Sequence, residues 1–480
     1  MPAPSKTAGR FPPPAPPLPK PQYGAAMAAA AGKHGTKASP SRQGPDRRRR
    51  NGGHEPHERT SCDDFGKGPV PAAGIGQEAK GTGKRPRDAG VKKLWYRHND
   101  GCGERPMFTI ETDTFAQELV TPLLQCTSPE ARGLEWQLLL GMYNNEHFHD
   151  DKVVLDYFPV GNGAWLKLFN WNDEKIQATD GQGYESIGHQ FLHLIHDLEE
   201  DYPKIEDSVF GCDAEGARRQ VDIVNELFGD ILPARIVGDA LYACPTQKLV
   251  HMMSMETMLF SLYDYPDLFK RLMDRLASDV NAYFDYLEQN RLLLPTVGFE
   301  GLGQGTYCAT TRLPGYDELE KRPFKTTDVW GFMDSQETVG ISPEMYEEFI
   351  FPYYKKISDR FGALSYGCCE PVDPLWDRCL SKLTNLRRIS ISPWCNEEIM
   401  GERLAGKPII YHRKPSAEFI GVGTTLDEEA VRACVRKTMN AAKGCKIEFT
   451  QRDVYTVHGD AEKVRRYVEI LRDEAAKFPY

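Results

Sequence analysis

The stretch Ala363-Leu364-Ser365-Tyr366-Gly367-Cys368-Cys369-Glu370 joins a short apolar segment to a polar one. Its first four residues predict a buried strand, because short apolar or aromatic runs that stop at a glycine are typical of such strands. The cysteines and the glutamate would then follow the carboxyl end of that strand. Catalytic groups of parallel barrels gather at this end, so the stretch predicts both an element of the fold and a site.

Strand-like and helix-like segments alternate on both sides of this stretch. Further strands are predicted at 152–160, 232–237, 293–299, 329–333, 388–391, 408–412 and 446–450. This alternation indicates an α/β fold, and over residues 151–480 it predicts a (β/α)8 TIM-type barrel. A doubly wound open sheet is the main alternative.

Helices are predicted from caps and from apolar spacing. Ser342 before Pro343 predicts a helix start, with apolar residues at helical spacing as far as Phe361. Segment 266–290 repeats the pattern, and Thr425-Leu426-Asp427-Glu428 predicts a capping box. The last helix should bury one stripe, formed by Val464, Tyr467, Val468, Leu471 and Ala475.

Composition divides the chain into three parts. Residues 1–90 are rich in Pro, Gly, Ala and basic residues and predict a disordered basic tail. Residues 91–150 are a helical lead-in, and 151–480 form the barrel. The Arg47–Arg50 run is interpreted as a solvated linker, with a nuclear or nucleic-acid signal as the alternative.

The net charge of -10 disfavours nucleic-acid binding by the folded part, because the basic residues concentrate in the tail. No apolar run is long enough to span a bilayer, and 25–31 lacks the core of a secretory signal. The 12 cysteines have no paired spacing, so we expect thiols in a cytoplasmic protein. The glycine-rich run at 301–305 lacks a phosphate-loop pattern, which disfavours nucleotide binding.

Polar residues follow several of the predicted strands and are the candidate site. Asp334, Gln336, Glu337 and Glu370 are candidate catalytic groups for general acid/base work or for orienting substrate. Candidate substrate-binding residues are Tyr366, His412, Arg413 and Lys414. The cations could pair with carboxylates of a small-molecule substrate, although ion pairs between helices are an equal alternative.

Cys368, Cys369 and Cys395 follow neighbouring strands and are candidate metal ligands. Thiolates with a nearby carboxylate or imidazole are ligands that zinc prefers, so Glu370 or His412 could complete the set. The alternative is that the cysteines only pack. His189, His193 and His196 lack a flanking glutamate, so we expect surface or capping roles for them, and likewise for His147 and His149.

Segments 255–268, 333–338 and 364–370, with the Ser-Pro-Glu-Met helix start, together resemble the uroporphyrinogen decarboxylase-like superfamily. That superfamily includes corrinoid-dependent methyltransferases and is related to cobalamin-independent methionine synthase. The resemblance covers residues 108–478 and implies a barrel enzyme.

In the methyltransferase branches a strand ends in His-x-Cys-Gly, whose His and Cys bind zinc with a later Cys or Glu. The matching segment here is Tyr366-Gly367-Cys368-Cys369, so only Cys368 carries over. Tyr366 replaces the histidine, and Gln451, Arg452 and Asp453 stand where a later cysteine would be. The Arg-Gln-Ala-Gly-Arg motif of the decarboxylases is also absent, and the first barrel strand reads Asp156-Tyr157-Phe158-Pro159-Val160-Gly161.

The leading hypothesis is a methyltransferase acting between a corrinoid or other methyl donor and a thiol-type acceptor, with zinc as a possible cofactor. A corrinoid carrier protein would be a possible partner. Two alternatives stay open. One is a metal-independent decarboxylase of a multiply carboxylated, porphyrinogen-like substrate, and the other is a non-catalytic barrel that binds a corrinoid or a metabolite.

Overall fold

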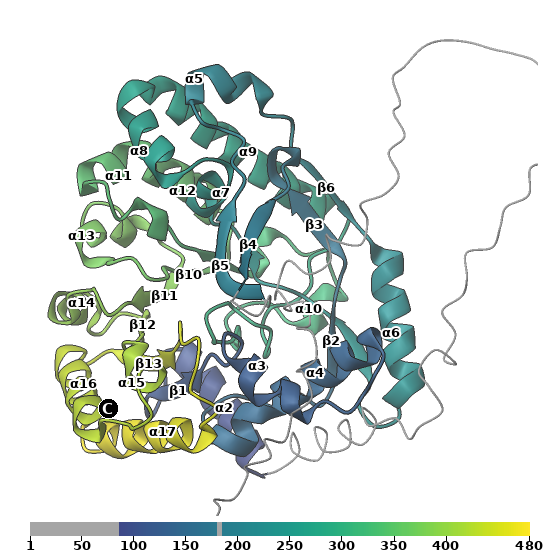
Figure 1. The fold of residues 1–480 in the computed structure, drawn as a ribbon, viewed down its shortest axis with the longest axis vertical. Helices are drawn as coiled ribbons and strands as arrows, with labels where there is room; N and C mark the ends of the chain where they lie inside the picture. The colour runs from purple at the N-terminus through teal and green to yellow at the C-terminus, as the bar shows by residue number, and fades with distance from the viewer. Residues whose placement is uncertain (1–85, 180–184) are drawn as a thin grey trace, which may run out of the picture.

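The principal sheet has seven parallel strands. The structure is a computed structural model and describes residues 86–179 and 185–480 (Figure 1). The order across the sheet is β1-β13-β12-β11-β10-β9-β8. The strands are β1 (Met107–Ile110), β8 (Leu241–Tyr242), β9 (Trp330–Met333), β10 (Ala363–Tyr366), β11 (Leu386–Ile391), β12 (Ile410–Arg413) and β13 (Lys446–Gln451). Because all neighbours run parallel, their carboxyl ends share one edge.

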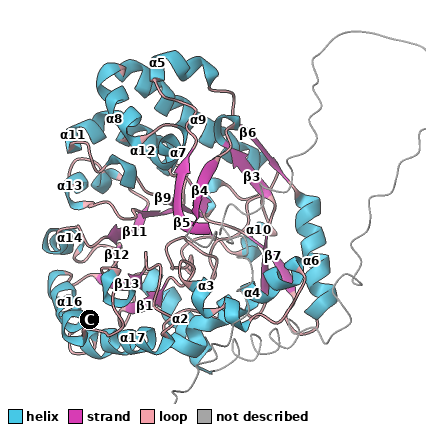
Figure 2. Ribbon diagram, viewed as in Figure 1, coloured by secondary structure: helices cyan, strands magenta, loops and turns pink. Residues whose placement is uncertain are grey.

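A helical segment follows each strand from β9 to β13. Figures 1 and 2 show α11, α13, α14, α16 and α17 along the outer side of the sheet. These segments are α11 (Pro343–Phe349), α12 (Phe351–Ser358), α13 (Asp373–Trp376), α14 (Glu397–Leu404), α15 (Glu418–Gly421), α16 (Glu428–Ala441) and α17 (Ala461–Ala475). The predicted α/β class is confirmed.

Other helices precede β9. They are α2 (Pro86–Asn99), α3 (Ala116–Leu119), α4 (Pro129–Tyr143), α5 (Leu198–Asp201), α6 (Ala214–Phe228), α7 (Pro245–Met252), α8 (Met255–Asp264), α9 (Pro266–Gln289) and α10 (Tyr316–Leu319). The predicted tail lies outside the described residues up to position 85, and α2 begins at Pro86. The predicted lead-in contains β1, which pairs with β13. In the described ranges, no helix is both long and apolar enough to cross a membrane.

Closure of the sheet into an eight-stranded barrel is not confirmed. β2 (Phe158–Gly161) pairs with β7 (Ala234–Val237) as a separate parallel pair. Among the described strands, none of the hydrogen-bonded ladders joins this pair to β1 or β8. Two antiparallel pairs complete the strands: β3 (Ala164–Lys167) with β6 (Val209–Cys212), and β4 (Lys175–Thr179) with β5 (Glu185–Phe191).

The predicted strands from β9 to β13 are confirmed to within two residues at each end. Upstream the predictions are poorer. Segment 152–160 becomes strand only at its end, and 293–299 is irregular, where the Gly298 N–H donates to the Glu300 carboxylate at 2.7 Å. β1 and the two-residue β8 were not predicted, because such short strands have little periodicity to read.

The predicted helix starts are largely confirmed, with two corrections. Ser342 Oγ accepts from the Met345 N–H, but the helix breaks at Ile350, because Pro352 lacks the N–H that would continue the ladder. Asp427, rather than Thr425, caps α16 by accepting from the Ala430 N–H. The predicted stripe of α17 is buried as expected.

A buried ion pair ties the sheet to α2. Arg388 on β11 and Glu448 on β13 have fully buried side chains, and their Nη2 and Oε2 atoms are 3.0 Å apart. Strand β12 separates β11 from β13, so the two side chains meet over the inward face of the sheet. Arg388 Nη2 also donates to Asn99 Oδ1 at 2.8 Å. The ion pair and the contact with Asn99 therefore hold β11 and β13 against the carboxyl end of α2.

Glu448→Ala should lower the free energy of unfolding by about 3–5 kcal/mol, because it leaves the Arg388 charge buried without its partner. The measurement is the urea midpoint followed by circular dichroism. Asp359→Ala removes the exposed partner of Lys355 and should cost under about 1 kcal/mol. Equal effects of the two substitutions would contradict a special role for the buried pair.

Candidate active site

Cys368 stands at the carboxyl end of β10, where the backbone turns. Gly367 has φ +95°, and a Cβ there would come within 3.0 Å of the Ser390 side chain, so the turn requires glycine. The Cys368 carbonyl accepts from Ser390 Oγ at 2.6 Å and from Lys414 Nζ at 3.2 Å. These contacts hold the loop after β10 against β11 and β12.

The Cys368 sulfur faces a cation. Arg452, directly after β13, places Nη1 3.1 Å from that sulfur, while Glu111 Oε2 holds its Nε at 2.9 Å. A hydrogen bond from Cys369 and the charges of Lys414 and Arg452 lower the pKa of Cys368 to about 7, against burial, which raises it. Cys368 therefore supplies thiolate at neutral pH, the reactive form of a thiol.

Cys369 faces a carboxylate instead. Its sulfur lies 3.6 Å from that of Cys368 and 3.3 Å from Asp453 Oδ2, so its single S–H can donate to either of these two acceptors. The interaction with Cys368 and burial raise the pKa of Cys369. The two neighbouring thiols thus differ in charge state, one being a thiolate near pH 7 and the other a thiol.

Two buried carboxyl groups complete the cluster. The Glu370 carboxylate accepts from the backbone N–H groups of Ser335 and Cys368, at 2.9 and 2.8 Å, and so joins the loops after β9 and β10. Asp334 is only 2% exposed, and its Oδ1 has no hydrogen-bond partner within the described structure. Burial, Glu370 and Cys368 raise the pKa of Asp334 well above its usual value. Asp334 is therefore a buried carboxylic acid with a proton to give.

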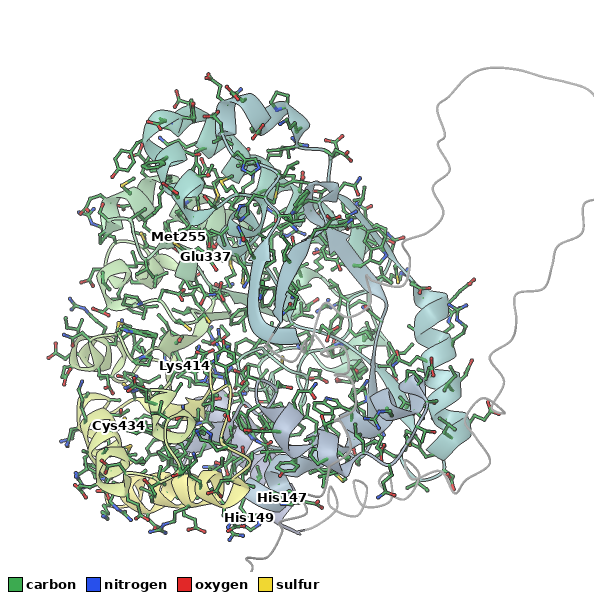
Figure 3. The ribbon with its side chains drawn as sticks, viewed as in Figure 1. His147, His149, Met255, Glu337, Lys414 and Cys434 are labelled. Atoms are coloured by element: carbon green, nitrogen blue, oxygen red, sulfur yellow. The ribbon has the colours of Figure 1, made fainter. Side chains whose placement is uncertain are left out.

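Lys414 is the predicted binding residue that reaches the cluster. It is 2% exposed, and Nζ also donates to Gln304 Oε1. Burial and Arg452 lower the pKa of Lys414. Figure 3 shows Lys414 among the strands and Cys434 on the outer helix α16.

Arg413 does not belong to the site. Side chains alternate between the two faces of a strand, so Arg413 points away from its neighbours 412 and 414. It pairs with Glu397 at 3.1 Å and donates to the carbonyls of Ile391 and Ser392. The alternative role, an ion pair between elements, is what the structure shows.

His412 and Tyr366 are structural neighbours of the site. His412 Nε2 lies 2.8 Å from Thr450 Oγ1, inside the sheet. The Tyr366 hydroxyl lies 2.7 Å from both Ser335 Oγ and the Tyr346 hydroxyl. Both side chains are fully buried in these contacts, so the structure gives them packing partners rather than an open face for substrate.

Glu337 turns toward α7. Its Oε2 accepts from Thr246 Oγ1 at 2.8 Å, and the same hydroxyl contacts Tyr354. Gln336 is half-buried on the same short 3-10 helix, Gln336–Thr338. Of the four predicted catalytic residues, Asp334 and Glu370 therefore lie with Cys368.

The donor set does not fit zinc. Across residues 86–179 and 185–480, no group of three or more His, Cys, Asp or Glu side chains is arranged to hold a metal ion. Cys395 Sγ accepts from the Val372 N–H at 3.4 Å and contacts Ser392, and burial raises its pKa. Arg452 already occupies the position beside the Cys368 sulfur. The tentative assignment of Cys368, Cys369 and Cys395 as one ligand set is thus not supported.

Sequence reasoning missed Arg452 and Gln304. In the sequence, Arg452 stands where methyltransferases of the superfamily that the chain resembles have a metal-ligating cysteine. A cation directly after the last strand is itself a signal for a site residue. Gln304 has φ +54° within the glycine-rich run at 301–305, and Gly305 lies against Thr450. That run is therefore folded against the sheet, a placement that no local pattern reveals.

The histidines expected to have surface or capping roles lie at or near the surface, with His189 and His196 exposed and His193 half-buried. His189 lies on strand β5, so it is not one helical turn from His193. Figure 3 shows His147 and His149 at the lower edge of the molecule, away from Lys414.

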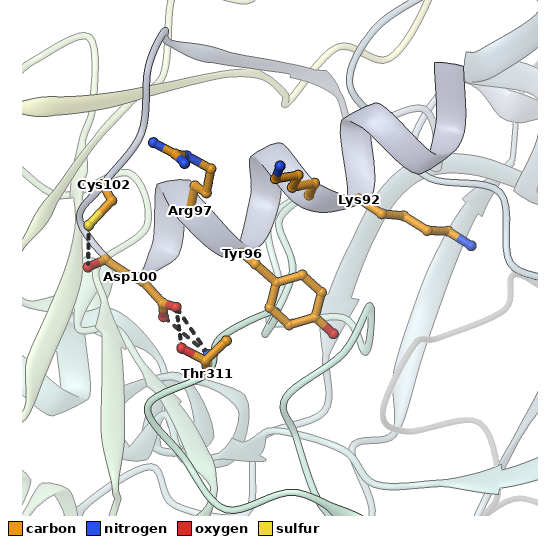
Figure 4. A pocket seen from close by; sticks show the side chains of 7 residues that line it. Lys92, Tyr96, Arg97, Asp100, Cys102 and Thr311 are labelled. Atoms are coloured by element: carbon orange, nitrogen blue, oxygen red, sulfur yellow. Dashed lines mark hydrogen bonds between the residues drawn. The ribbon is translucent and has the colours of Figure 1, made fainter. Parts of the chain in front are cut away.

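A separate surface cavity of about 620 Å³ lies along α2 (Figure 4). Its lining is Lys92, Lys93, Tyr96, Arg97, Asp100, Cys102 and Thr311. Two of these lining residues are joined by a hydrogen bond, in which Thr311 Oγ1 donates to the Asp100 carboxylate at 2.6 Å. The cavity shares no residue with the cluster around Cys368. The reactive thiol and the buried carboxyl groups of that cluster make it the candidate site.

No protein-family model matches this chain, and no curated protein matches it. Among solved structures, a methyltransferase from Methanosarcina mazei is similar over 81% of this chain and 98% of its own, with 11% sequence identity and a TM-score of 0.43. So distant a similarity identifies neither a family nor an activity.

Alkylation of Cys368 by iodoacetamide should reach half its maximal rate near pH 7, because only the thiolate reacts. Arg452→Met should move that midpoint upward by about one pH unit. Fragment-ion mass spectrometry that locates the label on Cys368 gives the rate. Arg465→Met, on the surface of α17, is the matched control, and a midpoint unmoved by Arg452→Met would contradict the assigned role of the guanidinium.

Asp334→Asn should stabilise the protein at alkaline pH. A raised carboxyl pKa means that the folded state keeps a proton which the unfolded chain releases above about pH 4. Stability from this group therefore falls as pH rises, and asparagine removes that loss. Thermal midpoints should be similar near pH 4 and higher for the variant at pH 8. Asp264→Asn, at an exposed position, is the control and should show no such gain. An Asp334→Asn variant with the same thermal midpoint as the wild type at pH 8 would refute the interpretation.

Proposed function

We propose that this chain is a methyltransferase of the uroporphyrinogen decarboxylase-like superfamily, with β2 and β7 completing a barrel around the inward face of the sheet. It would pass a methyl group from a corrinoid or another donor to a small thiol. The observation that carries this proposal is the Arg452 guanidinium 3.1 Å from the buried Cys368 sulfur. Local charge, rather than a metal, would keep a thiolate ionised in this site.

Cys368 is assigned the general base. Its thiolate takes the proton of the substrate thiol, and the substrate sulfur then forms a bond to the methyl carbon. The bond from methyl to donor breaks, and the donor leaves with the electron pair. Thiols of similar pKa exchange a proton at little cost, and Arg452 and Lys414 would stabilise the new thiolate in the buried site.

The acceptor should carry an acid group. Lys414 and Arg452 come from neighbouring strand ends, and burial strengthens their pull on an anion. Lys414 is held by the neutral side chain of Gln304. A carboxylate could replace this amide as the partner of Lys414.

The donor should present an apolar face. Large apolar side chains are exposed in the segments that follow four of the parallel strands, and one more is exposed at the end of a fifth strand, β8. They are Tyr242, Val339, Trp394, Val422 and Tyr455. A corrinoid, free or on a carrier protein, fits such a rim.

A second candidate is decarboxylation of a multiply carboxylated substrate. The unpartnered Oδ1 of protonated Asp334 favours it, since the carbon that loses carbon dioxide must gain a proton. Lys414 and Arg452 would hold the remaining carboxylates. Release of carbon dioxide from uroporphyrinogen, without methyl transfer, would select this function.

The full chain should methylate 3-mercaptopropionate with methylcobalamin as donor, and Cys368→Ser should slow the reaction about 10²–10⁴-fold, because the base is lost. Methyl thioether is measured by mass spectrometry. Cys434→Ser, on the outer helix α16, is the control and should match the wild type. Neutral 2-mercaptoethanol should be a poorer acceptor, and Arg452→Met should reduce the difference between the two thiols. Product formed equally fast by Cys368→Ser, or a methyl group found on Cys368 itself, would refute the proposal.

A further inference from the structure

The thiols of Cys368 and Cys369 are neighbours in space as well as in sequence. Their sulfurs lie 3.6 Å apart, with no side chain between them. One sulfur accepts from the guanidinium of Arg452, and the other lies 3.3 Å from the carboxylate of Asp453. A pair with a cation beside one sulfur and a proton acceptor beside the other has the parts of an attacking and a resolving thiol.

We propose that Cys368 and Cys369 are a redox pair, which a peroxide converts into a disulfide between adjacent residues. Methyl transfer as proposed above uses Cys369 only as a hydrogen-bond partner of Cys368 and has no need of the contact between Cys369 and Asp453. The inference gives this contact a function.

The chemistry needs only a hydroperoxide as oxidant. The Cys368 thiolate attacks one peroxide oxygen, the O–O bond breaks, and the leaving oxygen departs protonated, as water or an alcohol. Cys368 is then a sulfenic acid, oxidised by two electrons. Asp453 takes the proton of Cys369, whose sulfur attacks the Cys368 sulfur. The S–O bond breaks, and hydroxide leaves as water after it receives that proton.

Such a disulfide should be easily reduced. Adjacent Cα atoms are about 3.8 Å apart across a trans peptide, below the separation of about 4.4–6.8 Å that unstrained disulfides span. Strained disulfides have more oxidising potentials and are the labile, regulatory ones. The pair is thus suited to a reversible change.

Oxidation would also inactivate the site. A Cys368 sulfur in a disulfide is neutral and has no proton to accept, so methyl transfer would stop until a reductant restores the thiolate. This consequence rests on the proposed function, whereas disulfide formation does not.

The test treats the reduced full chain with stoichiometric hydrogen peroxide and maps the peptide that contains both cysteines. We expect that peptide to lose the mass of two hydrogens, to resist iodoacetamide, and to recover both labels after mild dithiothreitol. Cys369→Ser should instead leave Cys368 as sulfenic acid, which a second equivalent of peroxide takes to sulfinic acid, because no resolving thiol remains. Asp453→Asn should slow formation of the disulfide about tenfold or more, because the base that takes the Cys369 proton is lost.

Cys102→Ser, at an exposed thiol, is the control and should oxidise at residues 368 and 369 as the wild type does. Two free thiols after peroxide treatment, or sulfinic acid at Cys368 in the wild type, would overturn the inference. Disulfide formation in a chain without methyl transfer would support the redox pair and refute the transferase. Methyl transfer in a chain whose thiols never pair would do the reverse.

Discussion

Parallel pairing of the strands is the constraint on which the candidate site depends. Six ladders align β1 and β8 to β13, so residues from distant parts of the chain follow strand ends on one edge. Glu111, Cys368 and Arg452 meet only for this reason. The buried pair of Arg388 and Glu448 crosses β12 beneath them and ties this part of the sheet to α2.

Electrostatics then gives the site its character. Burial alone would keep Cys368 protonated, but the bond from Cys369 and the cations Lys414 and Arg452 outweigh it. The effect on Asp334 is the reverse, because burial and neighbouring negative charge raise the pKa of its carboxyl group and keep it protonated. One small space therefore holds an acid, a thiolate and two cations, a combination suited to moving protons and binding anions.

Reading the sequence succeeded where local pattern and tertiary environment agree. Strands β9 to β13 are short segments rich in β-branched or aromatic residues, and each was predicted nearly in full. The prediction was wrong where side-chain direction decides. Arg413, the last residue of β12, and Lys414, directly after it, are both basic in sequence, but Arg413 pairs with Glu397 and only Lys414 reaches Cys368. The prediction failed again at Cys395, whose thiol is taken up by backbone and hydroxyl groups of the adjacent loops.

The sequence by itself determined the α/β class and the strands that form most of the sheet, and it predicted a site at the segment that ends in Cys368-Cys369-Glu370. These follow from short-range periodicity and turn chemistry. Only the tertiary structure decided that Arg452, rather than a metal-ligand set, stands at the Cys368 sulfur, and that Asp453 faces Cys369. Contacts across 84 residues depend on strand order and side-chain direction, which no local pattern encodes.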